Sequence, residues 1–216
     1  MSKIQEVATA VERGKSKKVA GLVQEALDSG ASAPEILNAM IDSMTVVGDK
    51  FTKNEIFVPE MLVAARAMQK GVEVLKPLLV GENAVSAGKM IMGTVAGDLH
   101  DIGKNLVIMM LESAGFEVID LGVDVPAEKF IEALEENPDV KIVGASALLT
   151  TTMPALKETV KALNEYPGRD KIKVMVGGAP ITQEFADEIG ADAYTEDAAS
   201  AAQVAKKLAT SVSVPA

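Results

Sequence analysis

The chain has a single histidine, His100, which lies between two nearby aspartates, Asp98 and Asp101. A neutral imidazole can bind a metal ion through one ring nitrogen while the other ring nitrogen donates a hydrogen bond to a carboxylate. Either aspartate could accept that hydrogen bond. Alternatively, one aspartate caps the helix that follows by accepting backbone N–H bonds, and His100 is merely exposed. Residue spacing alone leaves both interpretations open.

One histidine cannot by itself form the usual zinc or non-haem iron site, which needs three or four protein ligands. The chain contains no cysteine, so thiolate ligands, iron–sulfur clusters and disulfides are excluded as well. A metal bound by His100 should therefore arrive inside a macrocycle that needs one axial ligand. Haem pockets usually rely on large apolar side chains, whereas aromatic residues make up only 3% of this chain. A corrin ring fits the composition better than haem.

Two further segments combine small and hydroxyl-bearing residues. The first reads Ser146-Ala147-Leu148-Leu149-Thr150-Thr151-Thr152, and the second reads Gly177-Gly178-Ala179-Pro180. Glycine at a strand end allows a ligand to approach the backbone closely, although the glycine pair could equally form a turn that starts a helix. The first helix of this half is not opened by a G-x-G-x-x-G motif, and no Walker motif occurs. Dinucleotide and P-loop sites are therefore disfavoured.

These segments lie in a C-terminal half where short β-rich runs alternate with helical patterns. The predicted strands are 89–95, 117–121, 141–147, 171–176 and a short fifth strand at 193–194. The predicted helices are 102–114, 127–136, 153–165, 182–189 and 198–208. This alternation predicts an α/β domain with a flavodoxin-like (Rossmann-like) five-stranded parallel sheet. Ligands of such sheets bind at the switch point between the first and third strands, which would place the His100 loop beside the Ser146 segment.

The N-terminal half shows a helical apolar period and no convincing strand. The predicted helices are 4–12, 16–27, 34–51 and 59–79, and their short links favour an antiparallel four-helix bundle. One apolar stripe of the third helix is expected to face the core: Ile36, Leu37, Met40, Ile41, Met44 and Val47. Residues 80–88 are small, polar and bounded by glycine, which predicts a linker. We therefore expect two domains, over residues 1–82 and 88–216.

The overall composition restricts the classes of partner. The 216-residue chain is 48% apolar and 24% charged, as is typical of soluble globular proteins. Its net charge of −10 argues against a nucleic-acid partner, which requires clustered basic residues. No apolar run approaches the roughly 20 residues of a membrane helix, and the N-terminus has no signal-peptide pattern. We expect a cytoplasmic protein without a membrane partner.

The motifs together resemble a known binding signature. The run Gly97-Asp98-Leu99-His100-Asp101-Ile102-Gly103, then Ser146-Ala147-Leu148, then Gly177-Gly178, resembles the cobalamin-binding signature of methionine synthase and of corrinoid proteins in methyltransferase systems. In the helical half, residues 44–51 and 57–59 resemble the cap bundle that precedes the cobalamin domain in those proteins. The resemblance covers about residues 1–208. The chain is thus similar to the corrinoid proteins of methanol, methylamine and related methyltransferase systems.

The resemblance implies a cobalamin or related corrinoid, such as methylcobalamin or hydroxocobalamin, bound base-off and His-on. His100 would be the lower axial ligand of cobalt in place of the displaced benzimidazole, and Asp98 would hold the imidazole. A loop hydroxyl would modulate the imidazole proton; the family often has serine there, whereas Thr152 keeps the hydroxyl and adds a methyl group. The nucleotide tail would thread between the first and third strands, beside Ser146, Leu148, Thr150, Gly177 and Gly178, with Ala198 as a further contact.

The same resemblance implies that Phe51 and Val58 cover the upper corrin face, with ordinary bundle packing as their alternative role. A cap protects methylated and reduced cobalt from water, oxygen and light, and it must lift to admit partners. The implied function is a methyl carrier, loaded by a substrate-specific methyltransferase and unloaded by a second methyltransferase that acts on tetrahydrofolate or coenzyme M. A reductive activator would restore oxidised cobalt. Because the chain has no barrel of its own, we expect a carrier subunit and not a complete enzyme.

Two other classes of cobalamin protein share parts of this pattern. Cobalamin-dependent sensors or regulators have similar cap and cobalamin domains but normally carry a DNA-binding or signalling segment, and no basic helix-turn-helix is evident here. Small subunits of adenosylcobalamin mutases share the D-x-H-x-x-G signature but generally lack this cap. Cofactor identity distinguishes them, because methyl or hydroxo forms favour the carrier and the adenosyl form favours the other two.

Overall fold

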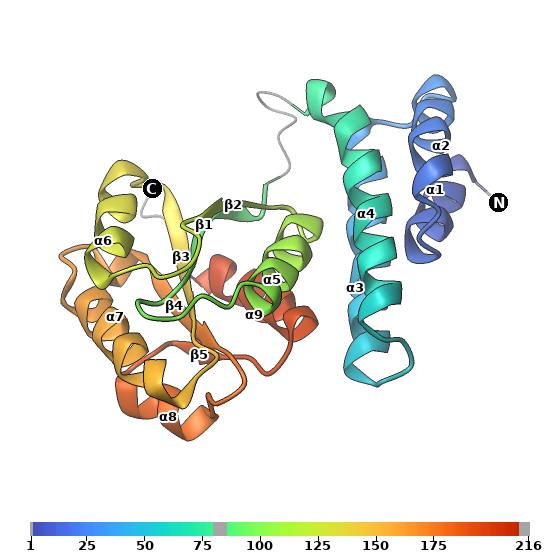
Figure 1. Ribbon diagram of the computed structural model, residues 1–216. Helices are drawn as coiled ribbons and strands as arrows, with labels where there is room; N and C mark the ends of the chain where they lie inside the picture. Colours follow the sequence, from blue (N-terminus) through green and yellow to red (C-terminus); the bar gives the residue numbers. More distant parts are fainter. Residues whose placement is uncertain (1, 80–85, 212–216) are drawn as a thin grey trace. The chain divides into compact units, whose positions relative to one another are not determined.

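The computed structural model describes residues 2–79 and 86–211 (Figure 1). The chain divides into two compact units, one formed mainly by the residues up to Ser86 and the other mainly by the residues from Ala87 onward. The first unit is helical, and the second combines helices with a sheet. None of the helices in the described part of the chain is both long enough and apolar enough to cross a membrane.

The helical unit contains four helices: α1 Lys3–Glu12, α2 Ser16–Asp28, α3 Ala33–Thr52 and α4 Val58–Leu75. Both α1 and α4 pack against α2 and α3, which gives the predicted four-helix arrangement. Helix α3 begins with a capping box, in which the Ser32 hydroxyl accepts from the Glu35 N–H and the Glu35 carboxylate accepts from the Ser32 N–H. The predicted apolar stripe of α3 is confirmed for five residues that are buried, while Ile41 is half-buried: Ile36, Leu37, Met40, Met44 and Val47.

The second unit is built on one parallel sheet. Its strands are β1 Gly88–Thr94, β2 Phe116–Asp120, β3 Val140–Ser146, β4 Lys173–Gly177 and β5 Ala193–Tyr194. They lie in the order β2-β1-β3-β4-β5, which confirms the flavodoxin-like topology and puts the switch point between β1 and β3. Thr94 pairs with Ser146, and Ser146 pairs with Gly177, so β1, β3 and β4 end level at one edge.

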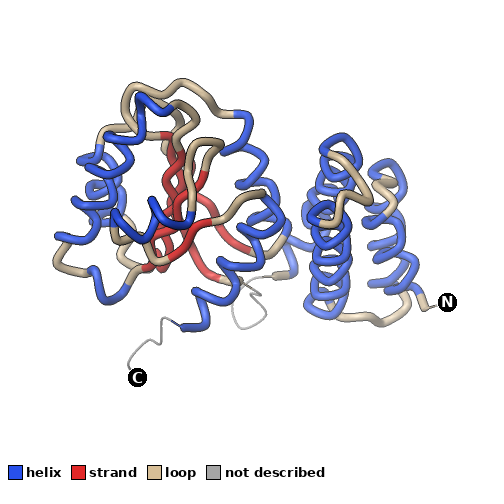
Figure 2. The backbone as a smooth tube through the Cα atoms, turned by 90° about the horizontal axis from the view of Figure 1, so that it is seen from below, coloured by secondary structure: helices blue, strands red, loops and turns tan. Residues whose placement is uncertain are grey.

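Helices cover both faces of this sheet (Figures 1 and 2). They are α5 Ile102–Ser113, α6 Ala127–Glu136, α7 Met153–Glu165, α8 Gln183–Ile189 and α9 Ala198–Ser211. Figure 1 shows α6 and α7 on one face and α5 and α9 on the other. The core beneath α6 and α7 contains Ile91 and Val143 of the sheet, packed with the fully buried Phe130 and Leu156 of the helices. This core holds the strand ends in fixed positions.

Several predicted element ends shift by a few residues. Helix α4 ends at Leu75, before Pro77, because proline lacks a backbone N–H; a short 3₁₀ turn, Lys76–Leu78, follows. Strand β4 starts at Lys173 because Arg169–Lys171 form another 3₁₀ turn. Residues 80–85 of the predicted linker lie outside the described residues, and its last residue, Gly88, already belongs to β1. The two predicted domain ranges remain a prediction.

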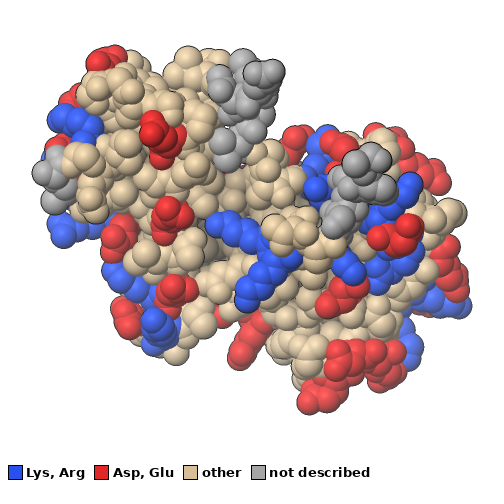
Figure 3. Space-filling model, turned by 180° about the vertical axis from the view of Figure 1, so that it is seen from behind, with Lys and Arg blue, Asp and Glu red and all other residues tan. Residues whose placement is uncertain are grey.

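Charged side chains are spread over the surface without a large field of one sign on the face that Figure 3 shows. Acidic and basic groups lie interspersed there, separated by uncharged residues. Several of the charges pair across elements, for example Lys50 of α3 with Glu12 of α1 at 2.6 Å and Lys89 of β1 with Asp139 at 2.9 Å. Such exposed pairs contribute little to stability.

The packing of Gly93 against Phe130 is testable. A Cβ at Gly93 would lie 2.7 Å from Cζ of the buried Phe130 ring. We expect Gly93→Ala to lower the free energy of unfolding by about 1–3 kcal/mol through overpacking. In a Phe130→Leu background the same substitution should be less destabilising. Urea unfolding of the native chain, the two single variants and the double variant measures both losses, and equal losses in the two backgrounds would contradict this packing.

Candidate functional site

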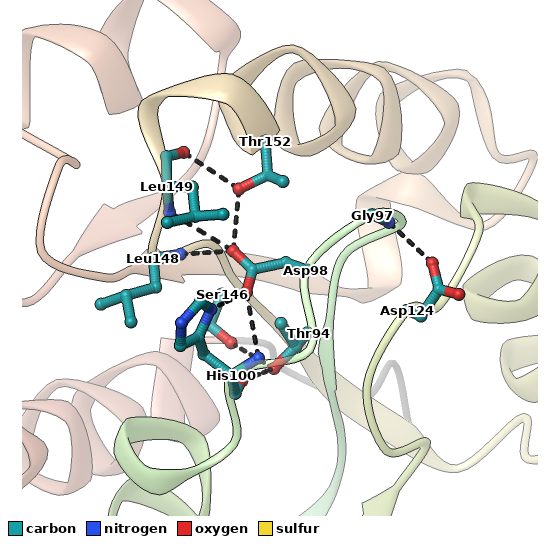
Figure 4. A network of polar contacts seen from close by, with 9 residues as sticks. All are labelled: Thr94, Gly97, Asp98, His100, Asp124, Ser146, Leu148, Leu149 and Thr152. Atoms are coloured by element: carbon teal, nitrogen blue, oxygen red, sulfur yellow. Dashed lines mark hydrogen bonds and ion pairs between the residues drawn. The ribbon is translucent and has the colours of Figure 1, made fainter.

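The loop between β1 and α5 carries His100 (Figure 4). Gly97 has φ +78°, a conformation that glycine adopts without strain. The Gly97 N–H donates to the Asp124 carboxylate at 2.7 Å, and the Val95 N–H donates to the carbonyl oxygen of Ser146 at 3.0 Å. The loop is thus tied to the end of β3 and to the segment that follows β2, and the turn at Gly97 directs Asp98 inward.

Asp98 is the centre of the hydrogen-bond network at this edge. Its side chain is completely buried. Oδ1 accepts from the ring Nδ1 of His100 at 2.7 Å and from the His100 backbone N–H at 3.1 Å. Oδ2 accepts from the Leu148 N–H at 2.7 Å, from the Thr152 hydroxyl at 2.8 Å and from the Leu149 N–H at 3.4 Å. One carboxylate therefore joins the loops that follow β1 and β3.

The charge of Asp98 fixes the tautomer of His100. Burial alone would raise the pKa of Asp98, but the bonds from the Leu148 N–H, the His100 ring, the Thr152 hydroxyl and the His100 N–H hold it well below its usual range. An ionised carboxylate can only accept hydrogen bonds. Nδ1 of His100 must therefore carry a proton, and in the neutral ring the lone pair lies on Nε2.

The environment of Nε2 suits a single axial bond to a flat, largely apolar group. The His100 side chain is 49% exposed, and its Nε2 has no hydrogen-bond partner among the described residues. Large apolar side chains on these two loops and at the start of α5 are exposed, as expected of a ligand-covered surface: Leu99, Ile102, Leu148 and Leu149. Within residues 2–79 and 86–211, no three His, Cys, Asp or Glu side chains cluster to hold a metal ion. These residues fit a metal held by a macrocycle.

The two aspartates that the sequence left open have different partners. Asp98 bonds His100, whereas the Asp101 carboxylate accepts from the Asn105 side chain at 3.1 Å. The helix-capping alternative for Asp98 is thus not needed, because all of its strong bonds go to the His100 loop and the β3 loop. Asp101 immediately precedes α5, and its carbonyl oxygen accepts from the Asn105 N–H at 2.7 Å.

Lys104 is a residue that sequence reasoning missed. Its side chain is 2% exposed, and its Nζ donates to both carboxylate oxygens of Asp120, at 2.7 and 2.8 Å, and to Oδ1 of Asn105 at 2.8 Å. This ion pair fastens the start of α5 to the end of β2. Lys104 is the only charged residue between positions 102 and 111, and that isolation in an apolar helix was the available signal.

The remaining predicted residues of the second unit differ in accessibility. A Cβ at Gly178 would lie 1.8 Å from the Ala147 carbonyl oxygen, and the φ of +131° also disfavours a side chain, so this glycine is required by the backbone. A Cβ at Gly103 would meet no atom within 4 Å. Thr150 is exposed in the 3₁₀ turn before α7, whereas Ala198 is buried at the start of α9.

The predicted cap residues lie at the end of α3 and the start of α4. Phe51 is half-buried, and Val58 is 40% exposed. Phe57, which sequence reasoning did not single out, is 63% exposed and immediately precedes α4. Phe57 and Val58 together make this turn an exposed apolar surface. The cap role of these residues stays a prediction.

Comparison with known proteins gives the same assignment to both units. Residues 88–203 match the B12 binding domain family, and residues 3–76 match a second family of the same description. Dimethylamine corrinoid protein of Methanosarcina barkeri is 45% identical over 207 residues, which cover 95% of this chain and 96% of that protein. A cobalamin-binding protein from Desulfitobacterium hafniense DCB-2 is similar in structure, with a TM-score of 0.80, 32% identity and coverage of 95% and 98%.

A chain of the methanol:cobalamin methyltransferase complex MtaBC from Methanosarcina barkeri is also similar, with a TM-score of 0.83 and 32% identity. The match covers 96% of this chain and 80% of that one. A flavodoxin-like sheet with an aspartate-held histidine at its switch point, preceded by a matching helical unit, defines a cobalamin-binding protein. The chain belongs to the family of corrinoid proteins of methylamine and methanol methyltransferase systems, and its cofactor is a cobalamin or related corrinoid.

The low pKa of Asp98 predicts how stability depends on pH. Because the folded-state pKa lies below the ordinary value of 3.8, the ionised carboxylate stabilises the fold above about pH 4, and this contribution is lost as the pH falls further. We expect Asp98→Asn to lower the free energy of unfolding by about 3 kcal/mol at pH 7. The difference from the native chain should shrink between pH 4 and pH 3.

Urea unfolding at several pH values measures this difference. Asp101→Asn is the matched control, since its carboxylate bonds the exposed Asn105 side chain and should contribute little. A loss for Asp98→Asn that is as small as that of the control, or that does not change with pH, would show that Asp98 is not the buried anion described above.

Proposed function

We propose that this chain carries a methyl group on the cobalt of a corrinoid bound base-off and His-on, with His100 as the lower axial ligand. The observation that carries the proposal is the orientation of the imidazole: Asp98 holds Nδ1, and Nε2 is left without a partner among the described residues. A histidine ligand whose second nitrogen donates to a carboxylate is fixed in orientation and is more basic at the metal. Family membership favours this carrier over a sensor or a mutase subunit.

The bound corrinoid supplies a cobalt that accepts a methyl group in its reduced state and yields it from its methylated state. Asp98 would hold Nδ1 of His100 as a hydrogen-bond donor whether or not Nε2 binds cobalt, so the imidazole would keep its orientation. The Asp98–His100 pair would thus present Nε2 to the cobalt in one fixed orientation.

Thr152 performs the hydroxyl role that the family usually assigns to serine. Its Oγ1 lies 2.8 Å from Asp98 Oδ2 and also 2.9 Å from the Leu149 carbonyl oxygen. Its additional methyl group faces Gly97, where even a Cβ would lie 3.7 Å away, an ordinary contact distance. The threonine methyl group therefore has room beside position 97, and the hydroxyl keeps its bond to Asp98.

The exposed apolar residues around His100 would contact the corrin and exclude water from the axial bond. In this proposal, Gly97, Leu99, Asp101, Ile102 and Gly103 would contact the corrin. The nucleotide tail would be held by Ser146, Leu148, Thr150, Gly177, Gly178 and Ala198. Phe51 and Val58, together with Phe57, would serve as the apolar cap.

The partner that loads the carrier is a substrate-specific methyltransferase, by analogy with the methanol:cobalamin methyltransferase complex. The identity of 45% with a dimethylamine corrinoid protein, against 32% with the chain of the methanol complex, favours a methylated amine as the donor. A second methyltransferase transfers the methyl group to tetrahydrofolate or coenzyme M, and a reductive activator restores oxidised cobalt. Purification with the enzyme encoded beside this chain tests the donor class.

The axial role of His100 predicts a spectral change. The chain reconstituted with hydroxocobalamin should show the absorption spectrum of imidazole-ligated cobalt, and His100→Ala should lose it. Thr159→Val is the control and should keep it, since the Thr159 hydroxyl donates to the Ala155 carbonyl oxygen within α7. An unchanged spectrum for His100→Ala would contradict axial ligation by this residue.

Substitution of Gly103 distinguishes an effect on folding stability from an effect on cofactor binding. Alanine in this open helical position should raise the free energy of unfolding by about 0.5–1 kcal/mol, because glycine loses more backbone entropy on folding. Gly21→Ala in α2 is the matched control, since it too would meet no atom within 4 Å. Only Gly103→Ala should weaken hydroxocobalamin binding, as measured by equilibrium titration. Equal affinity of both variants would remove Gly103 from the cofactor surface.

A further inference from the structure

Thr94 is buried at the end of β1 and is bonded to three segments (Figure 4). Its backbone N–H donates to the Gly122 carbonyl oxygen at 3.0 Å, and its carbonyl oxygen accepts from the Val125 N–H at 2.9 Å. Its hydroxyl oxygen lies 3.0 Å from the His100 carbonyl oxygen and 3.0 Å from the Ser146 hydroxyl oxygen. Thr94 therefore connects the His100 loop with the end of β3.

The number of available protons gives this hydroxyl chain a direction. The His100 carbonyl oxygen can only accept, so Thr94 must donate its single hydroxyl proton there. The contact between Thr94 and Ser146 then requires Ser146 to be the donor. In this arrangement the chain runs from Ser146 through Thr94 to the His100 backbone. Hydrogen bonds linked in this way strengthen one another.

A ligand at Ser146 can reverse or break this chain. Ser146 is half-buried at the switch point, and its proton is committed to Thr94. A ligand group that donates to Ser146 leaves the chain intact. A ligand atom that accepts the Ser146 proton removes the bond to Thr94, or makes Thr94 turn its own proton toward Ser146 and release His100. The type of group placed at Ser146 therefore alters how firmly the His100 backbone is held.

We propose that Thr94 is a positioning residue that couples the corrinoid tail to the loop of the axial ligand. This inference rests on the proposed function, in which the tail lies beside Ser146 and His100 binds cobalt. A benzimidazole displaced from cobalt has a free ring nitrogen, which is a hydrogen-bond acceptor. Such a tail accepts the Ser146 proton in place of Thr94. The hydrogen bond from Thr94 to the His100 carbonyl oxygen is then weakened. Tails without an acceptor nitrogen leave the hydrogen bond from Thr94 to the His100 carbonyl oxygen in place.

The test compares two cobamides in the whole chain: cobalamin, and the analogue whose tail ends in p-cresol, which has no ring nitrogen. The readout is the cobalt(II)/cobalt(I) midpoint potential, because cobalt(I) must release His100 and a firmer axial bond makes the potential more negative. In the native chain the p-cresol form should bind His100 about threefold more firmly, which is a potential about 30 mV more negative for a one-electron couple.

Four variants isolate the role of the hydroxyl. Thr94→Val keeps the shape and should abolish the difference between the two cobamides, whereas Thr94→Ser should restore it. Ser146→Ala removes the other end of the chain and should also abolish it, which keeps the test valid if Thr94→Val does not fold. Thr159→Val is the control, since Thr159 is equally buried and donates to the Ala155 carbonyl oxygen in α7.

The outcomes separate this inference from the proposed function. If the native chain shows no imidazole-ligated spectrum with either cobamide, axial ligation by His100 fails and the coupling fails with it. If ligation is present but the two potentials coincide in the native chain, only the coupling is overturned. A difference that persists in Thr94→Val or in Ser146→Ala also overturns it.

Discussion

The buried carboxylate of Asp98 is the interaction on which the site depends. A charge without solvent contact must be compensated, and five donors from two separate loops provide that compensation. These donors meet only because β1 and β3 are neighbours in the sheet, although the loops lie about fifty residues apart in the chain. The same bonds leave the His100 ring with one protonated and one free nitrogen. The function that we propose follows from this constraint.

Three side chains, referred to below as anchors, hold the His100 loop in place. Asp98 fixes the imidazole, Thr94 holds the backbone carbonyl oxygen of His100, and Lys104 fastens the following helix to the end of β2. The anchors differ in chemical character: one is a buried anion, one is a neutral hydroxyl, and one is a buried lysine paired with an exposed aspartate. A neutral hydroxyl can change the acceptor to which it donates at little energetic penalty, whereas a charged group that loses its partner is strongly destabilised. Adjustable coupling is therefore expected at Thr94, and rigidity at the other two.

Much of the architecture could be predicted from periodicity. The bounds of α6 and α7 agree with those predicted, and the strand order follows from the alternation of strands and helices. The site was predictable in its location but not in its bonds. Spacing could not choose between Asp98 and Asp101, because the choice depends on donors from the β3 loop. The burial of Lys104 depends on Asp120 at the end of another strand, and the exposure of Phe57 depends on how one helix starts. Both are tertiary properties that a local pattern does not contain.

His100 is the only histidine in the chain, so nitrogen-15 histidine labels a single imidazole. The most direct test of the central claim is the electron paramagnetic resonance spectrum of the cobalt(II) form of the labelled protein. An axial nitrogen-14 splits each cobalt line into three, and an axial nitrogen-15 splits it into two. Ligation by Nε2 of His100 predicts that labelling converts the triplets into doublets. Triplets that persist after labelling, or the absence of any axial nitrogen splitting, would contradict it.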